Sequence, residues 1–363
     1  MILVDRRKLL PPVIFVIILL ILLIIRSPLF NKSQKIDDIS GSDAFTIKGP
    51  AMGTSYTVSI KTDNDFINFD IIKKDIELIL SNINNQMSTY QIDSEISKFN
   101  LSDDFQKIAE FTISEDFANV INKSFYYNDL SDKVFDITIY PLYDLWGFQN
   151  KTNSINSPSK SAIDSTLKFV GMDKFQIKKN KLIKKNSNLS IDVSAIAKGY
   201  TVDLIYDYLS QKGFENYYID IGGETRVRSA TSKTGWTIGI AVPDLAYLGE
   251  VMQVVNLKNN SIATSGNYAN FIDYLNLDND RTHIINPITG YPLEIKNGVV
   301  SSASVIAPLC VDADAFATIL MILSKDDGLK LIESIDSVEA YIIYLEEGTL
   351  KTVQSSGFGF YLD

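Results

Sequence analysis

The order of helical and strand-like segments constrains the fold of this chain more than any other feature of its sequence. Apolar residues recur at helical spacing over residues 70–87, 114–128, 161–170 and 311–323, and shorter β-rich segments fill much of the chain between them. The two kinds of segment do not alternate strictly, as they do in chains built from βαβ units. This pattern predicts an α+β fold with mixed or antiparallel sheets.

The expected strands share alternating or β-branched residues bounded by turn residues. Residues 151–160 between them are polar and predict a loop. The strands are expected over residues 45–61 in two pieces around Gly49-Pro50-Ala51, a hairpin at 175–184, and segments 190–193, 217–229, 236–242, 251–257, 298–307 and 338–344.

Residues 1–28 predict a signal-anchor or a signal peptide. Arg6, Arg7 and Lys8 precede an uncharged, largely apolar run, so the N-terminus is expected to stay in the cytoplasm while the body is exported. No small-residue cleavage site follows the run, which favours an uncleaved anchor. We therefore expect a single anchor in a bacterial inner membrane, a polar tether over residues 29–43, and a folded domain over residues 44–363 on the periplasmic or extracytoplasmic side.

Charge and residue counts exclude several classes of function. The 363 residues carry a net charge of −10, and because the first forty carry +3, the remainder carries −13. Such an acidic body is a poor partner for nucleic acid, whose phosphates require a basic surface. Cys310 and His283 are the single cysteine and the single histidine, which excludes an intrachain disulfide, a thiolate metal site and a multi-histidine centre. Any metal must then have oxygen ligands, as Mg²⁺ or Ca²⁺ does.

Lys198 lies in an unusual position within the stretch SIDVSAIAKGY, residues 190–200. Ser190 to Val193 predict the end of a strand, and Ser194 opens a helix, so Lys198 falls near the first helical turn. A cation there meets the positive end of the helix dipole, which is mildly unfavourable. We therefore expect a negatively charged group at this helix end in the working protein.

The helix VDADAFATILMIL carries a carboxylate and a hydroxyl on one face, because Asp314 and Thr318 are four residues apart. A buried pair of this kind needs partners, and one solution is a hard cation with both side chains as ligands. The alternative is structural: Asp312 caps the helix, Asp314 complements its dipole, and Thr318 bonds back to the chain.

Three further stretches carry possible chemistry. His283 precedes the turn signal NPITG and is either a general base or a structural histidine. Met52 and Tyr90 lie beside small polar residues and could flank a planar ring, although each also fits a core or turn position. Gly222-Gly223 follows a strand and permits a close backbone approach, but lacks the spacing of a dinucleotide fingerprint.

Eight motifs in order resemble those of the ApbE-type FAD:protein FMN transferases and span about residues 45–325. They are AMGTSY, MSTYQIDSEISKFN, VFDITIYPLYDLWGF, IDVSAIAKGY, IDIGGE, ATSGNY, HIINPITGYP and DADAFAT. The resemblance implies a T-fold-like α+β architecture that binds FAD. It further implies Mg²⁺-dependent transfer of FMN to a threonine hydroxyl of a partner protein, with release of AMP. Acceptors in this family are typically subunits of Nqr- and Rnf-type membrane redox pumps.

The resemblance also assigns roles to residues at matching positions. The resemblance places Lys198 at an FAD-binding position and His283 in the segment that lines the diphosphate end. From these positions we expect Lys198 and His283 to be catalytic, with Lys198 stabilising charge on the leaving AMP and His283 serving as base. The expected Mg²⁺ ligands are the Ala195 carbonyl and the side chains of Asp314 and Thr318. The expected FAD contacts are Met52, Tyr90, Val134, Phe135, Asp136, Asp192, Lys198 and Ile285.

Departures from the family pattern leave alternatives open. The chain lacks the cysteine of lipoprotein relatives, Asn286 and Asn267 stand where aspartate is common, and Asp220 stands where asparagine is common. The alternative functions are an FAD pyrophosphatase that yields FMN and AMP, and a non-catalytic exported flavin-binding protein.

Overall fold

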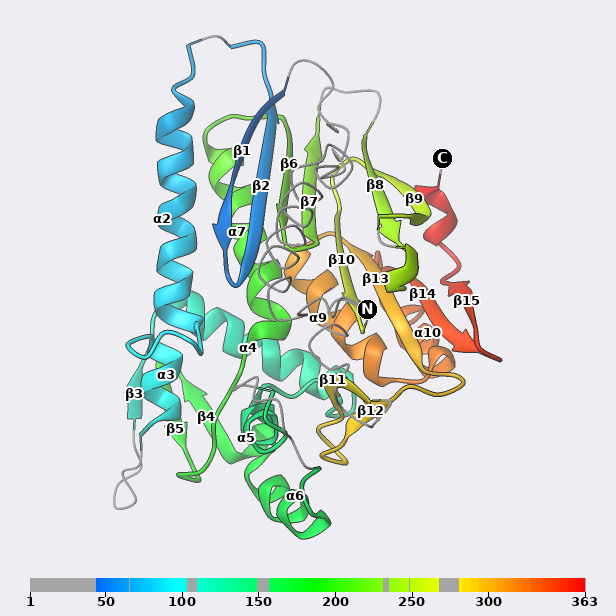
Figure 1. The fold of residues 1–363 in the computed structure, drawn as a ribbon. Helices are drawn as coiled ribbons and strands as arrows, with labels where there is room; N and C mark the ends of the chain where they lie inside the picture. Colours follow the sequence, from blue (N-terminus) through cyan, green and yellow to red (C-terminus); the bar gives the residue numbers. More distant parts are fainter. Residues whose placement is uncertain are drawn as a thin grey trace, which may run out of the picture. The chain divides into compact units, whose positions relative to one another are not determined.

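An eight-stranded sheet is the largest element of the computed structural model (Figure 1). Its strand order is β1-β2-β6-β7-β10-β13-β14-β15, and all pairings from β2 to β15 are antiparallel. This confirms the α+β class with antiparallel pairing. The strands are β1 (Ala44–Ala51), β2 (Thr54–Lys61), β6 (Asn216–Ile221), β7 (Glu224–Ser229), β10 (Ser261–Gly266), β13 (Val300–Ala307), β14 (Glu339–Glu346) and β15 (Thr349–Gln354).

The structure describes residues 44–64, 66–102, 110–148, 157–230, 235–247, 249–267 and 281–362. The expected membrane segment at 1–28, the tether at 29–43 and most of the expected loop at 151–160 lie outside these residues. None of the helices in the described part of the chain has the length and apolar character needed to cross a membrane. Residues 45–363 form one compact unit.

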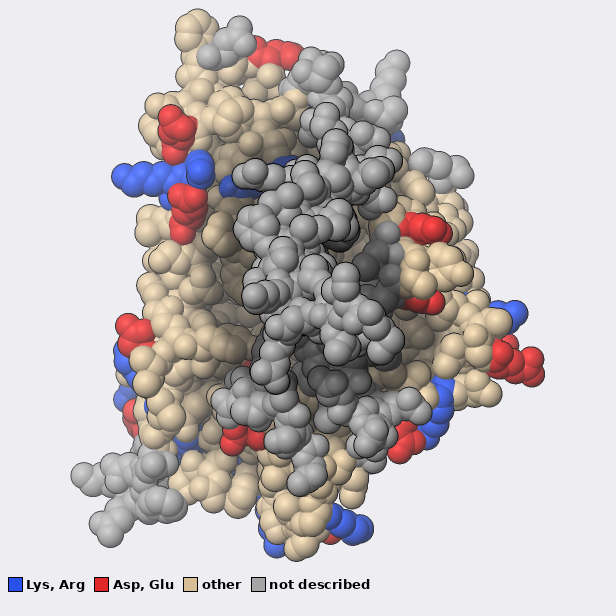
Figure 2. Space-filling view, in the orientation of Figure 1, with Lys and Arg blue, Asp and Glu red and all other residues tan. Residues whose placement is uncertain are grey.

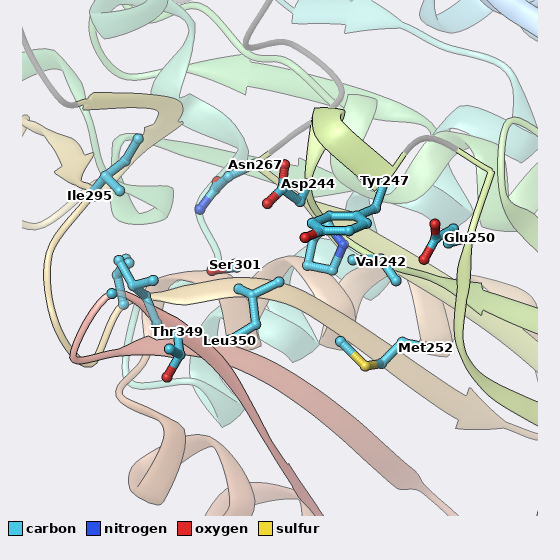
Figure 3. Close-up of a pocket in the computed structure, with 14 residues that line it drawn as sticks. Val242, Asp244, Tyr247, Glu250, Met252, Asn267, Ile295, Ser301, Thr349 and Leu350 are labelled. Carbon is cyan, nitrogen blue, oxygen red and sulfur yellow. The ribbon is translucent and has the colours of Figure 1, made fainter.

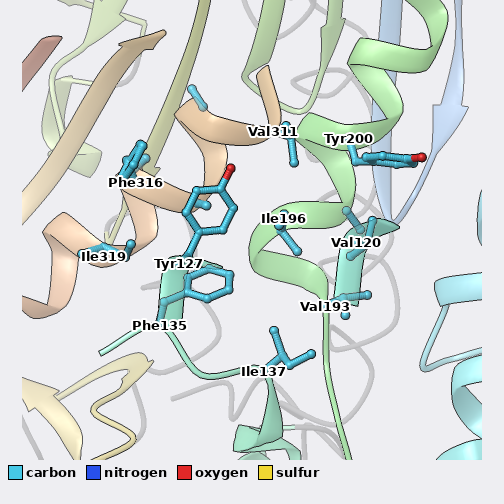
Figure 4. Packing of buried hydrophobic residues seen from close by; sticks show 14 of the residues in the cluster. Val120, Tyr127, Phe135, Ile137, Val193, Ile196, Tyr200, Val311, Phe316 and Ile319 are labelled. Carbon is cyan, nitrogen blue, oxygen red and sulfur yellow. The ribbon is translucent and has the colours of Figure 1, made fainter. Parts of the chain in front are cut away.

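Helices line one face of the sheet. Helix α7 (Ser194–Gln211) contacts β6 and β7, and helix α9 (Cys310–Ile322) contacts β10 and β13. Helix α10 (Lys325–Ile332) contacts β14, and the long helix α2 (Phe69–Met87) packs along α7. The apolar side chains between α7, α9 and their neighbours form the main core, in which Ile196 and Val311 face the ring of Tyr127 (Figure 4).

The opposite face of the sheet is covered by a separate hairpin of β8 (Trp236–Ala241) and β9 (Val251–Leu257). Successive residues of a strand point to opposite faces, and the two cores divide accordingly. Ala263 and Val305 belong to the helix-side core, whereas their neighbours Ile262 and Ile306 pack with Trp236 of the hairpin.

The remaining elements extend from the helix side of the sheet. A three-stranded sheet of order β3-β5-β4 packs near α4, and β11 pairs with β12 in a hairpin whose first strand contacts α9. The helices are α3 (Glu95–Asn100), α4 (Glu115–Leu130), α5 (Tyr140–Leu145) and α6 (Lys160–Thr166), and the strands are β3 (Glu110–Thr112), β4 (Phe175–Lys178), β5 (Lys181–Lys184), β11 (Arg281–Ile285) and β12 (Pro292–Glu294).

Local sequence explains where most helices begin. Asn68 accepts backbone N–H groups at the start of α2, and Ser114 and Ser324 do the same for α4 and α10. The helices expected near residues 70–87, 114–128 and 311–323 are confirmed. The two central helices differ, because α7 begins after Val193 and α9 after Leu309 without a cap from either side chain.

One expected turn was misplaced. Residues 49–51 do not divide two strands but form the end of β1, and the chain reverses at Met52-Gly53. Pro50 is tolerated because β1 is the edge strand, where a missing N–H need not break the ladder.

The expected strand end at residues 190–193 was also wrong. This segment is irregular and pairs with a side chain rather than with another strand. Asn100 brackets it with two hydrogen bonds of 2.8 Å, donating from Nδ2 to the Ile191 carbonyl and accepting the Ile191 N–H at Oδ1. The segment therefore leads into α7 without belonging to a sheet.

Charged side chains of both signs are interspersed on the described part of the face shown in Figure 2. Elsewhere in the described chain, exposed charged side chains also form ion pairs, such as Lys160 with Asp164 at 2.9 Å.

Candidate active site

Two hairpin turns, the start of α7 and the end of α2 enclose a cavity of about 680 Å³. The turns are Met52-Gly53 between β1 and β2, and Gly222-Gly223 between β6 and β7. They adjoin because β2 pairs with β6, and the Gly222 N–H donates to the Ser55 carbonyl at 3.1 Å. Four of the expected site residues line this cavity together, namely Met52, Tyr90, Asp192 and Lys198.

Met52 reaches the cavity from a strained backbone. Its φ of 48° and the φ of 79° at Gly53 are both positive, as in two-residue hairpin turns that favour Asn-Gly. A residue with a Cβ costs roughly 1–2 kcal/mol in this region. Strain of this kind is characteristic of functional sites, and here it holds a polarizable side chain at the cavity wall.

Tyr90 is an exposed aromatic ring on the same cavity. Its exposed fraction is 84 %, although large aromatic side chains normally contribute to a core. The ring lies in the segment that follows α2, beside Thr89 and Gln91, which also line the cavity. An exposed ring at a cavity wall is available to stack on a planar ligand.

Lys198 points from α7 to carboxylates supplied by other elements. Its Nζ lies 3.1 Å from Oε1 of Glu224, the first residue of β7. Burial alone would lower the pKa of Lys198, but the nearby Asp314 and Glu224 carboxylates outweigh it and raise that pKa. The expected negative group at this helix end is therefore present within the protein itself, even without a ligand.

Glu224 also belongs to this site, although the sequence did not identify it as a site residue. Its side chain is 6 % exposed, and burial raises its pKa, although Lys198 opposes this effect. In the sequence, the only indication of this role is that a glutamate directly follows Gly222-Gly223. Its role becomes clear only in the structure, where the hairpin places Glu224 against α7.

Asp314 is buried at the crossing of α7 and α9. Its Oδ2 accepts the backbone N–H of Gly199 at 2.9 Å. Burial raises the pKa of Asp314, while Lys198 and the Gly199 N–H act in the opposite direction. A Cβ at position 199 would lie 2.5 Å from the Cys310 carbonyl oxygen, so Gly199 permits helix contact rather than ligand approach.

Thr318 and Ala195 complete the expected set of oxygen ligands. Thr318 follows Asp314 by one helical turn, and its Oγ1 lies 3.4 Å from Oγ of Ser265 on β10. Ala195 lies in the first turn of α7, three residues before Lys198. No cluster of three or more His, Cys, Asp or Glu side chains suited to a metal occurs among the described residues. A cation here would therefore depend on one carboxylate together with hydroxyl and carbonyl oxygens.

Asp203 on α7 anchors the start of α9. Its Oδ1 accepts the Cys310 N–H at 2.9 Å, and its Oδ2 accepts the Val311 N–H at 3.0 Å. Oδ1 also pairs with Arg226 of β7 at 2.7 Å. The carboxylate therefore supplies the cap that the α9 sequence lacks and sets the position of Asp314. No local pattern in the sequence signals this role.

His283 lies on β11, the strand that contacts α9. Burial lowers its pKa to about 4, so the imidazole is neutral at pH 7 and can accept a proton. Ile285 is 1 % exposed and packs with Leu142 and Trp146 in a separate apolar cluster. The Ile285 side chain therefore does not line the cavity.

Val134, Phe135 and Asp136 lie between α4 and α5. Val134 and Phe135 are buried in the main core, where Phe135 packs edge-on against Tyr127. Asp136 caps a short 3₁₀ turn by accepting the Thr138 N–H at 2.8 Å. The segment adjoins the cavity through its backbone, since the Ile137 carbonyl accepts the N–H of Asp192 at 2.7 Å.

Two departures from the family pattern have local explanations. Asp220 holds the β6–β7 turn by accepting the Gly223 N–H at 3.2 Å, and Asn286 holds the turn after β11 by accepting the N–H groups of Ile288 and Thr289. Carboxylate and amide oxygens can both accept such hydrogen bonds. The exchange of aspartate and asparagine is therefore compatible with both turns.

The fold and the site define an α+β protein in which a lysine flanked by buried carboxylates lies at the wall of an open, partly aromatic cavity. Comparison with known proteins identifies its family. The model of the ApbE family matches residues 52–342, and the chain belongs to that family.

Individual relatives match over most of their length. The FAD:protein FMN transferases of Vibrio cholerae and Haemophilus influenzae are each 32% identical to this chain, covering 86% of it and 91% and 90% of the relatives. The structure of flavin transferase ApbE from Vibrio cholerae superposes with a TM-score of 0.78 at 31% identity, covering 88% of this chain and 99% of that one. The apo flavinyl transferase ApbE of Pseudomonas stutzeri gives a TM-score of 0.77 at 27% identity, covering 88% and 97%.

Proposed function

We propose that this chain is a magnesium-dependent enzyme that transfers FMN from FAD to a threonine hydroxyl of a partner protein and releases AMP. Its family and its relatives, which are named FAD:protein FMN transferases, make it an enzyme that transfers flavin from FAD. Mg²⁺, the threonine acceptor and AMP release are further parts of the proposal. The observation that carries them is Lys198, which lines the cavity while its ammonium pairs with Glu224 and is further stabilised by the nearby Asp314 carboxylate.

The charges at this position suit a divalent cation beside a diphosphate. Burial raises the pKa of Glu224 and of Asp314, and a bound cation would favour the ionised form of both. With both ionised, these two carboxylates and the Lys198 ammonium have a net charge of −1. Asp314 Oδ1, the Thr318 hydroxyl and the Ala195 carbonyl are hard oxygen donors of the kind that Mg²⁺ prefers. A bound Mg²⁺ would change the local charge to +1 and would neutralise the negative charge of the substrate phosphates.

The cavity supplies the remaining binding groups for FAD. Tyr90 and Met52 present an aromatic ring and a thioether to the planar isoalloxazine or adenine, and Lys198 faces the phosphates. The start of α7 adds its backbone N–H groups, which favour anions at a helix N-terminus. Together these groups orient FAD with its diphosphate near Asp314.

The transfer replaces one phosphorus–oxygen bond with another. The acceptor threonine oxygen bonds to the FMN phosphorus, the bond from that phosphorus to AMP breaks, and the hydroxyl proton passes to a base. His283 is the proposed base, because its imidazole is neutral at pH 7. Lys198 stabilises the charge that develops on the departing AMP.

The proposal extends to the location of the reaction. The apolar run at residues 9–25 with its basic flank supports an inner-membrane anchor that holds the domain on the extracytoplasmic side. Subunits of Nqr- or Rnf-type redox pumps are the proposed acceptors.

The decisive experiment incubates the full chain with FAD, Mg²⁺ and a threonine-bearing acceptor subunit. Mass spectrometry of the acceptor and an assay of AMP separate the possible functions. An FMN-sized mass gain on the threonine with AMP release supports the transferase. AMP and free FMN with an unmodified acceptor indicate a pyrophosphatase, and intact FAD indicates a binding protein.

The metal ligands are tested with isosteric variants. Asp314→Asn keeps an acceptor for the Gly199 N–H but removes the charge, and Thr318→Val removes the hydroxyl. We expect both variants to lose Mn²⁺ binding measured by electron paramagnetic resonance, and to lose FMN transfer. Asp312→Asn on the same helix is the control, because Asp312 pairs with Lys123 and Tyr127 instead. Unchanged Mn²⁺ binding by Asp314→Asn would disprove the ligand assignment.

A further inference from the structure

A second cavity, of about 560 Å³, lies on the sheet face covered by the β8–β9 hairpin (Figure 3). Its walls come from the loop that joins β8 to β9, the end of β10, the start of β13 and the β14–β15 hairpin. Met252 and Leu350, which line it, also pack against the apolar cluster on that face. This cavity shares no lining residue with the first one.

One buried polar atom in this cavity lacks a partner. Asn267 is 6 % exposed, and its Nδ2 donates to the Val300 carbonyl at 2.9 Å. Its Oδ1 receives no hydrogen bond from the described residues. A buried oxygen is destabilising when it lacks a donor, so the cavity is suited to a ligand that donates a hydrogen bond.

The charge of the cavity indicates what kind of donor fits. Asp244 and Glu250 are among the described lining residues, whereas lysine, arginine and histidine are not. Figure 3 shows Asp244 between Asn267 and the ring of Tyr247. Much of the remaining wall is aliphatic. A long side chain with an apolar stem and a cationic end matches this combination.

The cavity begins close to the proposed metal ligands. Ser265 contacts Thr318, and Asn267 follows Ser265 by two residues. At the rise of an extended chain this separation is about 7 Å. This short separation along the chain is the reason for considering a single acceptor segment for both places.

We propose that this cavity binds a lysine or arginine side chain of the acceptor protein, an inference that rests on the proposed transferase function. The N–H groups of the basic side chain donate to Asn267 Oδ1, and the carboxylates of Asp244 and Glu250 balance its charge. Its aliphatic stem packs on Met252 and Leu350. The cavity thereby selects the partner without contacting FAD.

The first test measures transfer kinetics with the full-length double variant Asp244→Asn/Glu250→Gln. We expect its KM for the acceptor to rise at least tenfold and to lose its dependence on salt, while its KM for FAD stays unchanged. The matched control is Glu110→Gln/Asp164→Asn, which removes the same charge at two exposed ion pairs elsewhere. An acceptor KM equal to that of wild type would overturn the proposal while leaving the transferase function intact.

The second test does not depend on catalysis. Binding of Nα-acetyl-lysine methylamide and of its norleucine counterpart is followed by NMR of the full chain in detergent. We expect the lysine compound alone to shift the Asn267 side-chain amide, and the double variant to lose that shift. Equal responses to both compounds, or none to the lysine compound, would overturn the proposal even if FMN transfer also failed.

Discussion

The backbone N–H of Gly199 donates to Oδ2 of Asp314 at 2.9 Å, and this bond joins α7 to α9 at the site itself. Together with the two hydrogen bonds that Asp203 accepts from the start of α9, this bond holds the helix that carries Lys198 in register with the helix that carries the proposed metal ligands. The contact is close because residue 199 has no side chain.

Replacing Gly199 with alanine should destabilise the protein. The new Cβ would lie 2.5 Å from the Cys310 carbonyl oxygen and 2.8 Å from Asp314 Cβ, so the two helices would have to separate. We expect a loss of about 2–3 kcal/mol in the free energy of unfolding, measured with urea. Helix propensity alone predicts the opposite sign, a gain of about 1 kcal/mol.

Gly359→Ala is the control for this experiment, since a Cβ there meets no atom within 4 Å. We expect it to change the free energy of unfolding by less than about 0.5 kcal/mol. A Gly199→Ala variant as stable as this control would show that the helix crossing tolerates a side chain.

Asp203→Asn should be costly because it leaves Arg226 buried without its counter-charge. The carboxylate pairs with Arg226 at 2.7 Å and caps α9 through two N–H groups. We expect a loss of about 3–5 kcal/mol in the free energy of unfolding. The exposed pair of Lys160 and Asp164 is the comparison, and Asp164→Asn should cost less than about 1 kcal/mol. Similar losses in the two variants would refute the anchoring role of Asp203.

His283 should make stability depend on pH between about 4 and 6.5. Its pKa falls to about 4 in the folded protein, so the unfolded chain binds more protons throughout this interval. The free energy of unfolding should therefore rise as the pH rises through the interval and stay level above it. The size of the effect is on the order of 3 kcal/mol.

The measurement compares wild type with His283→Gln from pH 4 to 7.5, because other groups cancel in the difference. A difference curve that stays flat below pH 6.5 would contradict the shift. If His283 accepts the threonine proton, the rate of FMN transfer should also show no inflection near pH 6.5.

Tyr90→Ala should weaken FAD binding without affecting the fold. The ring is 84 % exposed and lines the cavity, so its loss removes ligand contact rather than core packing. Stacking contributes about 1 kcal/mol, which corresponds to a roughly fivefold rise in the Kd for FAD. Tyr90→Phe should retain wild-type affinity, as should Ile92→Ala, which alters a side chain that is 77 % exposed outside the cavity. FAD titration by fluorescence checks all three, and equal Kd values would remove Tyr90 from the binding site.

Much of the fold could be predicted from the sequence, because the patterns that encode helices and strands are local. The spacing of apolar residues over 70–87 and 311–323 identified α2 and α9. The structure shows that the caps at Asn68 and Ser114 are local features as well. The predictions of secondary structure were wrong where the local pattern was ambiguous. Residues 190–193 have the composition of a strand but bond to Asn100 instead.

The sequence by itself also determined the chemistry available to this protein. One cysteine and one histidine leave oxygen as the ligand for a metal, and the spacing of Asp314 and Thr318 places both on one helix face. Tertiary structure alone decided which charges meet. Lys198, Glu224 and Asp314 come from three elements, and Gly199 and Asp314 are 115 residues apart. Such contacts depend on strand pairing and helix packing across the whole domain, which no local pattern records.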